Sequence, residues 1–224
     1  MQEQAVTNYE DLDPDVRLML QVRDDNAAAF EELVTRYQAR LLSLFRHLIR
    51  GKDQSEDLAQ EVFLRIYRAR KRYVPGAKFS TWLFKIAHNV ASNALRSASR
   101  RREVNIVSRS SGALPSYSLD GLAQAASGLM PTRQLDTAER AEMVRLAMDS
   151  LNDRQRMALL LSKFEGMTYA DIAETMDLST AAIKSLLSRA RGNLREILEP
   201  YIDKGLLTQD VTSSSPVDNA PNEE

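Results

Sequence analysis

The chain contains 224 residues, 43% of them apolar and 27% charged, which is enough for one large or two small domains with buried cores. It has no cysteine, which excludes disulfides and thiolate chemistry, and its two histidines lack a metal-binding spacing. Phosphate-loop, nucleophile-elbow and zinc-protease motifs do not occur in it. We therefore expect no catalytic residue, no cofactor and no metal site.

The 30 basic and 31 acidic side chains are unevenly distributed along the chain. Residues 26–102 carry a net charge of +10, whereas residues 1–25 carry −5 and residues 201–224 carry −4. A basic block of this kind is expected where one domain meets a polyanion. The N-terminal stretch does not resemble a signal peptide, and no apolar run approaches the ~20 residues of a membrane span. We therefore expect a cytoplasmic protein without membrane insertion.

Three helices are predicted in the basic block. Apolar residues at helical spacing run over 30–48, stop near Gly51, and resume over 53–70 after a start that resembles a capping box. A turn at 74–76 separates these two stretches from a third one over 79–101. The pattern indicates an all-helical first domain.

The second half of the chain begins with a change of composition. Ser, Gly and Pro fill 11 of the 34 positions of residues 103–136, without a helical or strand period, which indicates a flexible linker. Capping signals at Asp136, Asn152, Thr168 and Ser179 then precede short apolar-periodic segments, so four short helices are expected. The predicted fold is all-α, with two small helical domains joined by the linker. The predicted parts are an acidic N-terminal extension (1–21), a helical domain (22–102), the linker (103–136), a second helical domain (137–200) and an acidic, disordered tail (201–224).

The most specific local signal is a helix-turn-helix pattern over residues 168–191. Apolar residues such as Ile172, Leu178 and Ile183 would lock two short helices together, with small Ala173 at their close approach. The second helix would present small and hydroxyl side chains to bases and cations to phosphates. Its candidate DNA-binding residues are Ser179, Thr180, Ala181, Lys184, Ser185, Ser188 and Arg189. The competing interpretation is a plain helical hairpin, which needs the same apolar positions.

Two further surfaces are predicted in the first domain. On the helix over 53–70, a patch suited to a protein partner lies opposite the buried stripe and consists of Asp57, Gln60, Glu61 and Leu64. The alternative for this patch is a solvated face with one exposed leucine. In residues 68–102, basic side chains surround Tyr73, Phe79, Trp82 and Phe84, a mixture that suits single-stranded or distorted nucleic acid. The alternative there is that the aromatic rings belong to the core or pin the loop.

Three sequence motifs resemble those of the extracytoplasmic-function sigma factors of bacterial RNA polymerase. They are the Asp-Leu-Ala-Gln-Glu motif within 57–64, the Phe-Ser-Thr-Trp-Leu motif within 79–89, and the helix-turn-helix within 170–191. The resemblance covers roughly 22–102 and 137–199. It implies a protein without catalysis of its own that binds core RNA polymerase and promoter DNA and opens the minus-ten element during transcription initiation.

The resemblance also implies a role for each surface. The Asp57 patch would dock on the polymerase clamp, the helix-turn-helix would read the minus-thirty-five element, and the linker would run toward the polymerase active site. The residues assigned to minus-ten DNA are Arg72, Tyr73, Lys78, Phe79, Trp82, Lys85, Asn89 and Arg96. An anti-sigma factor stays open as a further partner.

The chain departs from the family pattern in three features. Leu186 stands where arginine is frequent, the linker is long, and both ends are acidic. The alternative function is a helix-turn-helix regulator whose first domain binds an effector or dimerises, although such a domain needs neither the basic aromatic block nor the Asp57 patch. An enzyme acting on nucleic acid lacks the clustered carboxylates, metal ligands or nucleophile that it would require.

Overall fold

The computed structural model describes residues 13–49, 52–108 and 137–203. The first half contains α2 (Pro14–Arg23), α3 (Ala27–Leu48), α4 (Lys52–Ala69), a single 3₁₀ turn (Arg70–Arg72) and α5 (Phe79–Ser108). The second half contains α7 (Thr137–Asp149), α8 (Asp153–Lys163), α9 (Tyr169–Met176) and α10 (Thr180–Asp203). These residues form no strand, so the predicted all-α class is confirmed. None of the described helices is both long and apolar enough to cross a bilayer.

Helix α2 was not expected from the sequence. The Asp13 carboxylate accepts a hydrogen bond from the Asp15 backbone N–H, and Pro14 occupies the first helical position, which suits its fixed backbone angle. Val16, Met19 and Val22 of α2 are buried against α3. Residues 14–21 of the predicted acidic N-terminal extension thus contribute to the core.

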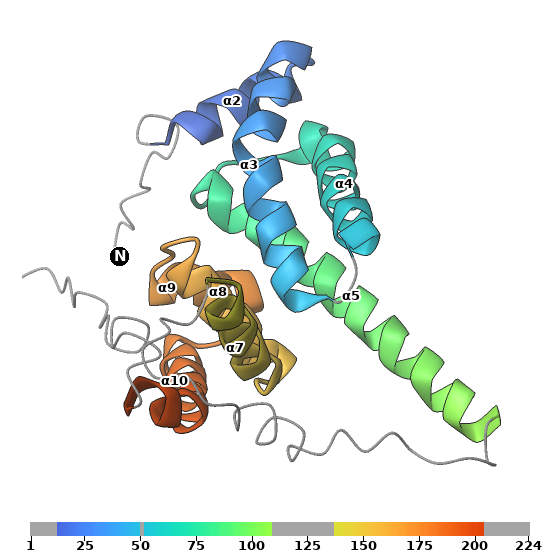
Figure 1. Ribbon diagram of the computed structural model, residues 1–224. Coiled ribbons are helices and arrows are strands. Elements are labelled where there is room, and N and C mark those ends of the chain that lie inside the picture. The colour runs from blue at the N-terminus through green and yellow to red at the C-terminus, as the bar shows by residue number, and fades with distance from the viewer. Residues whose placement is uncertain (1–12, 50–51, 109–136, 204–224) are drawn as a thin grey trace, which may run out of the picture.

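Helices α3, α4 and α5 form the rest of the first half. Helix α3 crosses α5, α4 lies beside α3, and the C-terminal part of α5 projects away from the other helices (Figure 1). Buried Leu33, Leu41 and Phe45 lie along one side of α3, as the apolar period predicts. Helix α5 continues to Ser108, so the predicted linker start at residue 103 was wrong. Residues 109–136 of that linker lie outside the described part.

The second half has the four helices that the capping signals predict. Asn152 and Thr168 form complete capping boxes, and the Ser179 hydroxyl accepts the Ala182 N–H at 3.2 Å. Asp177 ends α9 in the left-handed conformation, with φ 52°, which aspartate tolerates better than most residues. Helix α10 was expected to end before Pro200 but continues to Asp203, at the cost of one helical hydrogen bond.

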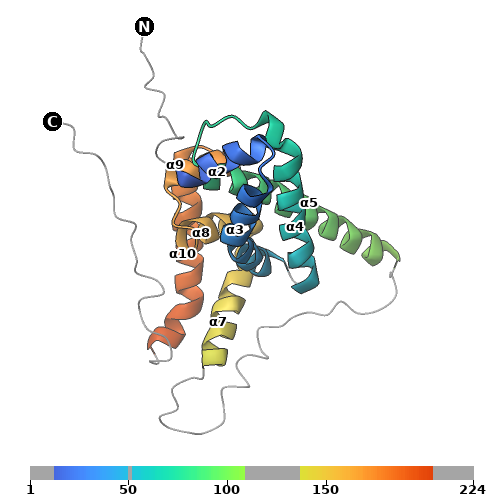
Figure 2. The same cartoon turned by 90° about the horizontal axis from the view of Figure 1, so that it is seen from above.

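The two halves pack directly against each other. Helix α9 lies on the first part of α5 and α8 contacts α3, and buried residues of both halves belong to one continuous apolar cluster. Viewed from above, α7 and the C-terminal part of α10 extend to the same side (Figure 2). The division into domains 22–102 and 137–200 stays a prediction. The last 21 residues of the predicted tail, 204–224, lie outside the described part.

Candidate functional surfaces

The predicted protein-binding patch on α4 faces solvent. Asp57 and Gln60 are exposed, and Leu64 keeps 43% of its surface accessible. Glu61 is half-buried because its carboxylate accepts a hydrogen bond from Arg65 Nε at 2.7 Å, one helical turn away. All four predicted residues are thus on one accessible face, opposite the buried stripe that holds α4 on the bundle.

Beside this patch the surface is hollowed into an apolar groove of about 790 Å³ between α3 and α4. Phe30 of α3 contacts the rings of Phe63 and Tyr67 of α4, with centroid distances of 6.4 and 5.2 Å. The groove is lined by Ala27, Phe30, Val34, Asp57, Gln60, Glu61, Phe63, Leu64 and Tyr67. An acidic patch next to an exposed apolar groove suits a protein partner better than a nucleic acid. Sequence reasoning missed Phe30, Val34 and Tyr67, because they come from two helices whose pairing is tertiary.

The predicted minus-ten residues separate into two groups. The polar members lie on the surface of α5 and of the segment before it, and they are Arg72, Lys78, Lys85, Asn89 and Arg96. Arg96 is held against its own helix by hydrogen bonds to the Ser92 carbonyl and the Asn93 side chain. Exposed cations along one helix suit the backbone of a nucleic acid strand.

The aromatic members of the predicted minus-ten set are mostly interior. Phe79 is fully buried and Tyr73 keeps only 4% of its surface accessible, so neither ring is accessible in this structure and their contact with DNA stays a prediction. Phe79 packs on the Tyr37 ring at 5.3 Å, and half-buried Trp82 lies between Tyr73 and Phe79. Burial raises the pKa of the Tyr73 hydroxyl, which finds no hydrogen-bond partner in the part of the chain that the structure describes. The rings pin the loop instead, and they leave Val74 at its tip 77% exposed, a residue that the sequence analysis did not select.

The helix-turn-helix has the geometry that its sequence predicts. Ile172, Ile183 and Leu187 are buried between α9, α8 and α10. The seven predicted DNA-binding residues, from Ser179 to Arg189, are all exposed at the N-terminal end of α10. Ser179 also caps that helix, so one lone pair of its hydroxyl oxygen already accepts the Ala182 N–H. Arg191 donates to the Tyr169 hydroxyl at 3.1 Å and so ties α10 to α9.

In the described part of the chain, three ion pairs join the two halves. In each pair the cation belongs to the first half and the carboxylate to the second. The pairs are Arg40 Nε with Glu165 Oε2 at 2.7 Å, Lys78 Nζ with Asp171 Oδ2 at 3.2 Å, and Lys85 Nζ with Asp177 Oδ1 at 2.6 Å. Sequence reasoning missed the three acids, because an isolated carboxylate carries no local signal of its partner.

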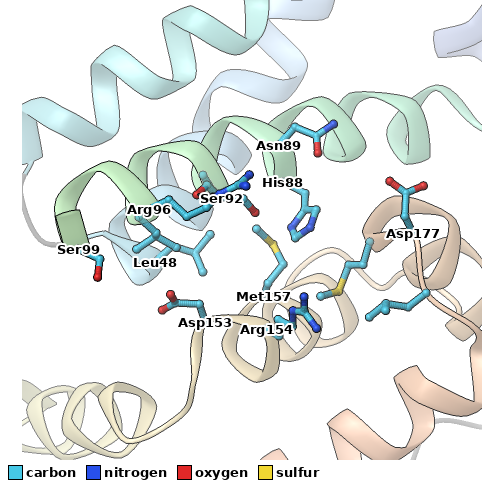
Figure 3. Close-up of a pocket in the computed structure, with 14 residues that line it drawn as sticks. Leu48, His88, Asn89, Ser92, Arg96, Ser99, Asp153, Arg154, Met157 and Asp177 are labelled. Carbon is cyan, nitrogen blue, oxygen red and sulfur yellow. Dashed lines mark hydrogen bonds between the residues drawn. The ribbon is translucent and has the colours of Figure 1, made fainter.

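A pocket of about 590 Å³ lies between α5 and the α8–α9 region (Figure 3). His88 and Arg96 of α5 face Met157 of α8, Arg154 near its start and Asp177 at the end of α9 (Figure 3). The buried Nδ1 of His88 has no hydrogen-bond partner among the described residues. Burial lowers the pKa of His88, and the positive charges of Arg154 and Arg96 add to this effect, while Asp177 opposes it. Among the described residues no cluster of His, Asp or Glu could hold a metal ion.

Two family models match this chain. Residues 33–101 match the model of Sigma-70 region 2, and residues 141–194 match that of Sigma-70 region 4. The chain is 30% identical over 192 residues to the ECF RNA polymerase sigma-E factor of Escherichia coli, covering 83% of this chain and 94% of that relative. The chain belongs to the extracytoplasmic-function (ECF) sigma factors. A further relative is the RNA polymerase sigma-H factor of Pseudomonas aeruginosa, 29% identical over 84% of this chain and 95% of that protein.

Two solved structures share the fold. CnrH, in complex with the cytosolic domain of CnrY, superposes with a TM-score of 0.61 at 22% identity, over 84% of this chain and 99% of that one. RpoE of Bartonella quintana, in complex with the anti-sigma factor NepR, gives a TM-score of 0.55 at 23% identity, over 76% and 96% of the two chains. This ECF sigma factor therefore binds core RNA polymerase and promoter DNA and directs transcription initiation.

Proposed function

We propose that this ECF sigma factor binds its partners through three separate surfaces, which lie on α4, on α5 with the loop before it, and on α10. The α4 face with Asp57, Gln60, Glu61 and Leu64 binds core polymerase. The cations of the loop and α5, with Val74 at the loop tip, hold the opened minus-ten strand. The N-terminal end of α10 reads the minus-thirty-five element. The protein acts in the cytoplasm and has no catalytic site of its own.

The observation that carries this proposal is the exposure of the α4 patch beside its apolar groove. Leu64 is 43% exposed although it is apolar, and it adjoins a groove whose walls include Phe30 and Tyr67. Leaving such apolar surface in water is unfavourable, which supports a protein partner at this position. The exposed cations of α5 and α10 support the two DNA contacts in the same way.

An anti-sigma factor is a further candidate partner. The solved structure of RpoE from Bartonella quintana contains one, the anti-sigma factor NepR. The inter-half pocket, which is lined by both polar and apolar residues, and the apolar α4 groove offer two surfaces to which such a partner of this chain could bind.

Charge reversal of Asp57 tests the polymerase assignment. Asp57 is exposed and lies off the buried stripe, so Asp57→Lys should weaken capture of core RNA polymerase about tenfold or more, as losing a charge pair in an interface does, while the chain stays folded. Capture is measured by pull-down at several polymerase concentrations. The matched control is Glu174→Lys on α9, which reverses an exposed acid far from α4. Capture by Asp57→Lys at wild-type strength would remove the assignment.

A further inference from the structure

The loop between the 3₁₀ turn and α5, residues 73–78, is short and irregular. Val74 at its tip is 77% exposed, and the described part of the chain shows no main-chain hydrogen bond for residues 74–77. A Cβ added at Gly76 would meet no atom within 4 Å, so nothing packs closely against the loop there. The shape of the loop therefore depends on how its two ends are attached.

The upstream end is attached to Asp25, in the turn between α2 and α3. The Asp25 carboxylate accepts hydrogen bonds from Arg70 Nε at 3.1 Å and from Lys71 Nζ, and both donors belong to the 3₁₀ turn. These hydrogen bonds, first that from Lys71 and then that from Arg70, lower the pKa of Asp25. The Arg70 carbonyl in turn accepts the Tyr73 N–H at 3.1 Å. One carboxylate thus holds the turn from which the loop begins.

Both members of this contact are fixed in a second way. The Arg70 guanidinium lies over the Tyr67 ring, 4.0 Å from its centroid, and donates to the Tyr67 carbonyl at 3.0 Å. Asp25 has φ 67°, a left-handed conformation that costs free energy for a residue other than glycine unless its surroundings stabilise it. Its pairing with two cations is the contact that offsets this cost.

The downstream end of the loop is attached to Asp13, which precedes α2. Asp13 Oδ2 accepts the Phe79 N–H, the donor at the start of α5, at 2.8 Å. Asp13 and Asp25 flank the same ten-residue helix, α2, which is about 15 Å long and is anchored by fully buried Val16 and Met19. Both ends of the loop are therefore bound to one rigid element.

We propose that Asp25 is a positioning residue for the minus-ten strand. Together with Asp13 at the other end of α2, it holds both ends of the loop, so that Val74 and the cations beside it are in place before the strand arrives. The proposal rests on the proposed function of this loop. A loop that is ordered in advance loses less conformational freedom when the strand binds, which favours binding. Helix α2 thereby takes part in promoter opening without touching DNA.

Loop mobility in the free, full-length protein is the direct test. Because the chain has no native cysteine, Val74→Cys can be spin-labelled selectively, and this position is exposed. Asp25→Asn preserves the turn, because asparagine tolerates the left-handed backbone, but it removes the charge that holds Arg70 and Lys71. The mobile component of the label's spectrum should then grow about 1.5- to fivefold, the ratio that corresponds to one exposed ion pair.

Asp24→Asn is the matched control. Asp24 is the neighbouring exposed acid, and its ion pair joins it to Arg23 of α2. This substitution should leave the label unchanged. Asp25→Gly is a second variant that should mobilise the label at least as much as Asp25→Asn, because glycine adopts the left-handed conformation freely and removes every acceptor of the side chain. Equal mobility of the label in Asp25→Asn, Asp25→Gly and Asp24→Asn would overturn the proposal.

Promoter opening provides the functional readout. Holoenzymes containing each variant are compared on a promoter that the wild-type holoenzyme selects from random-sequence DNA, and unpaired thymines are detected with permanganate. Asp25→Asn should form about two- to tenfold fewer open complexes at subsaturating holoenzyme, while capture of core polymerase stays at wild-type strength. A general loss of stability would lower both.

The outcomes separate this proposal from the function on which it rests. More open complexes with Asp25→Asn than with Asp24→Asn would show that Asp25 masks Arg70 and Lys71 instead of positioning the loop. If Val74→Asp and Lys78→Ala left promoter opening unchanged, the proposed function of the loop would be wrong, whereas the label would still report whether Asp25 holds it.

Discussion

Half-buried His88 faces charged side chains from three directions. Four charged residues line the same pocket as His88. Arg96 lies on the same helix, α5, Asp153 and Arg154 belong to α8, and Asp177 ends α9. Burial lowers the pKa of the imidazole, and the two arginines lower it further against the opposing charge of Asp177. The folded protein therefore favours the neutral ring more than the unfolded chain does.

This preference predicts a loss of stability on acidification. Below the unfolded pKa of about 6.5, the unfolded chain binds a proton that the folded protein does not yet bind, so the free energy of unfolding falls as pH falls toward the lowered folded pKa. The slope contributed by His88 is at most about 1.4 kcal/mol per pH unit. Urea unfolding between neutral and mildly acidic pH measures it.

His88→Asn should flatten this part of the pH profile, because it removes the titrating ring. His47→Asn is the control, since the His47 ring is exposed and lies outside the pocket. A profile for His88→Asn that remains as steep as that of His47→Asn would show that another group causes the acid dependence.

Among the helices, α2 and α5 depend on the same carboxylate. Asp13 Oδ1 accepts the Asp15 N–H at 2.9 Å at the start of α2, and Asp13 Oδ2 accepts the Phe79 N–H at 2.8 Å at the start of α5. One side chain thus satisfies a free backbone donor at two helix starts, and the second donor, Phe79, is 66 residues from Asp13 in sequence. Its negative charge also suits both N-terminal dipoles.

Removing this carboxylate should destabilise the first half. We expect Asp13→Ala to lower the free energy of unfolding by about 1–3 kcal/mol, more than a single cap usually contributes, because two helix starts lose an acceptor. Asp13→Asn keeps an acceptor oxygen and should lose less. Denaturant unfolding checks both, with exposed Asp24→Ala as the control. A loss for Asp13→Ala no larger than for Asp24→Ala would contradict the double cap.

At the scale of the whole molecule, the two halves share one apolar cluster. Leu83 and Phe84 of α5 and Ile172 and Met176 of α9 belong to it, and all four are buried. The ion pairs of Arg40, Lys78 and Lys85 surround this contact. The halves therefore stabilise each other in the free protein.

Mutual stabilisation predicts coupled unfolding. Leu83→Ala, in the core of the first half, should cost about 2–5 kcal/mol and should also speed amide hydrogen exchange in α8 and α9 at low salt. At high salt, where the ion pairs are screened, exchange in α8 and α9 should respond less to the same substitution. Exchange in α8 and α9 that is indifferent to Leu83→Ala at low salt would show that the halves fold independently.

Many of the helices of this protein can be predicted from local sequence patterns. Apolar residues at helical spacing predict α3, α4 and the start of α5, because a helix that buries one stripe repeats its apolar side chains every three to four residues. The capping boxes at Asn152 and Thr168 involve neighbours only three residues apart, so sequence alone places those helix starts. The accessible face of α4 and the exposed end of α10 follow from the same periodicity.

The remaining features depend on contacts between distant parts of the chain. Lys78 and Asp171 are 93 residues apart in sequence, and Lys85 and Asp177 are 92 apart, so no local pattern pairs them. Tyr73 and Phe79 are buried because α2, α3 and the loop close over them, although their basic neighbours made them resemble DNA-stacking rings. Periodicity determines which side of a helix is buried, whereas only the packing of helices determines what covers that side and which charges meet.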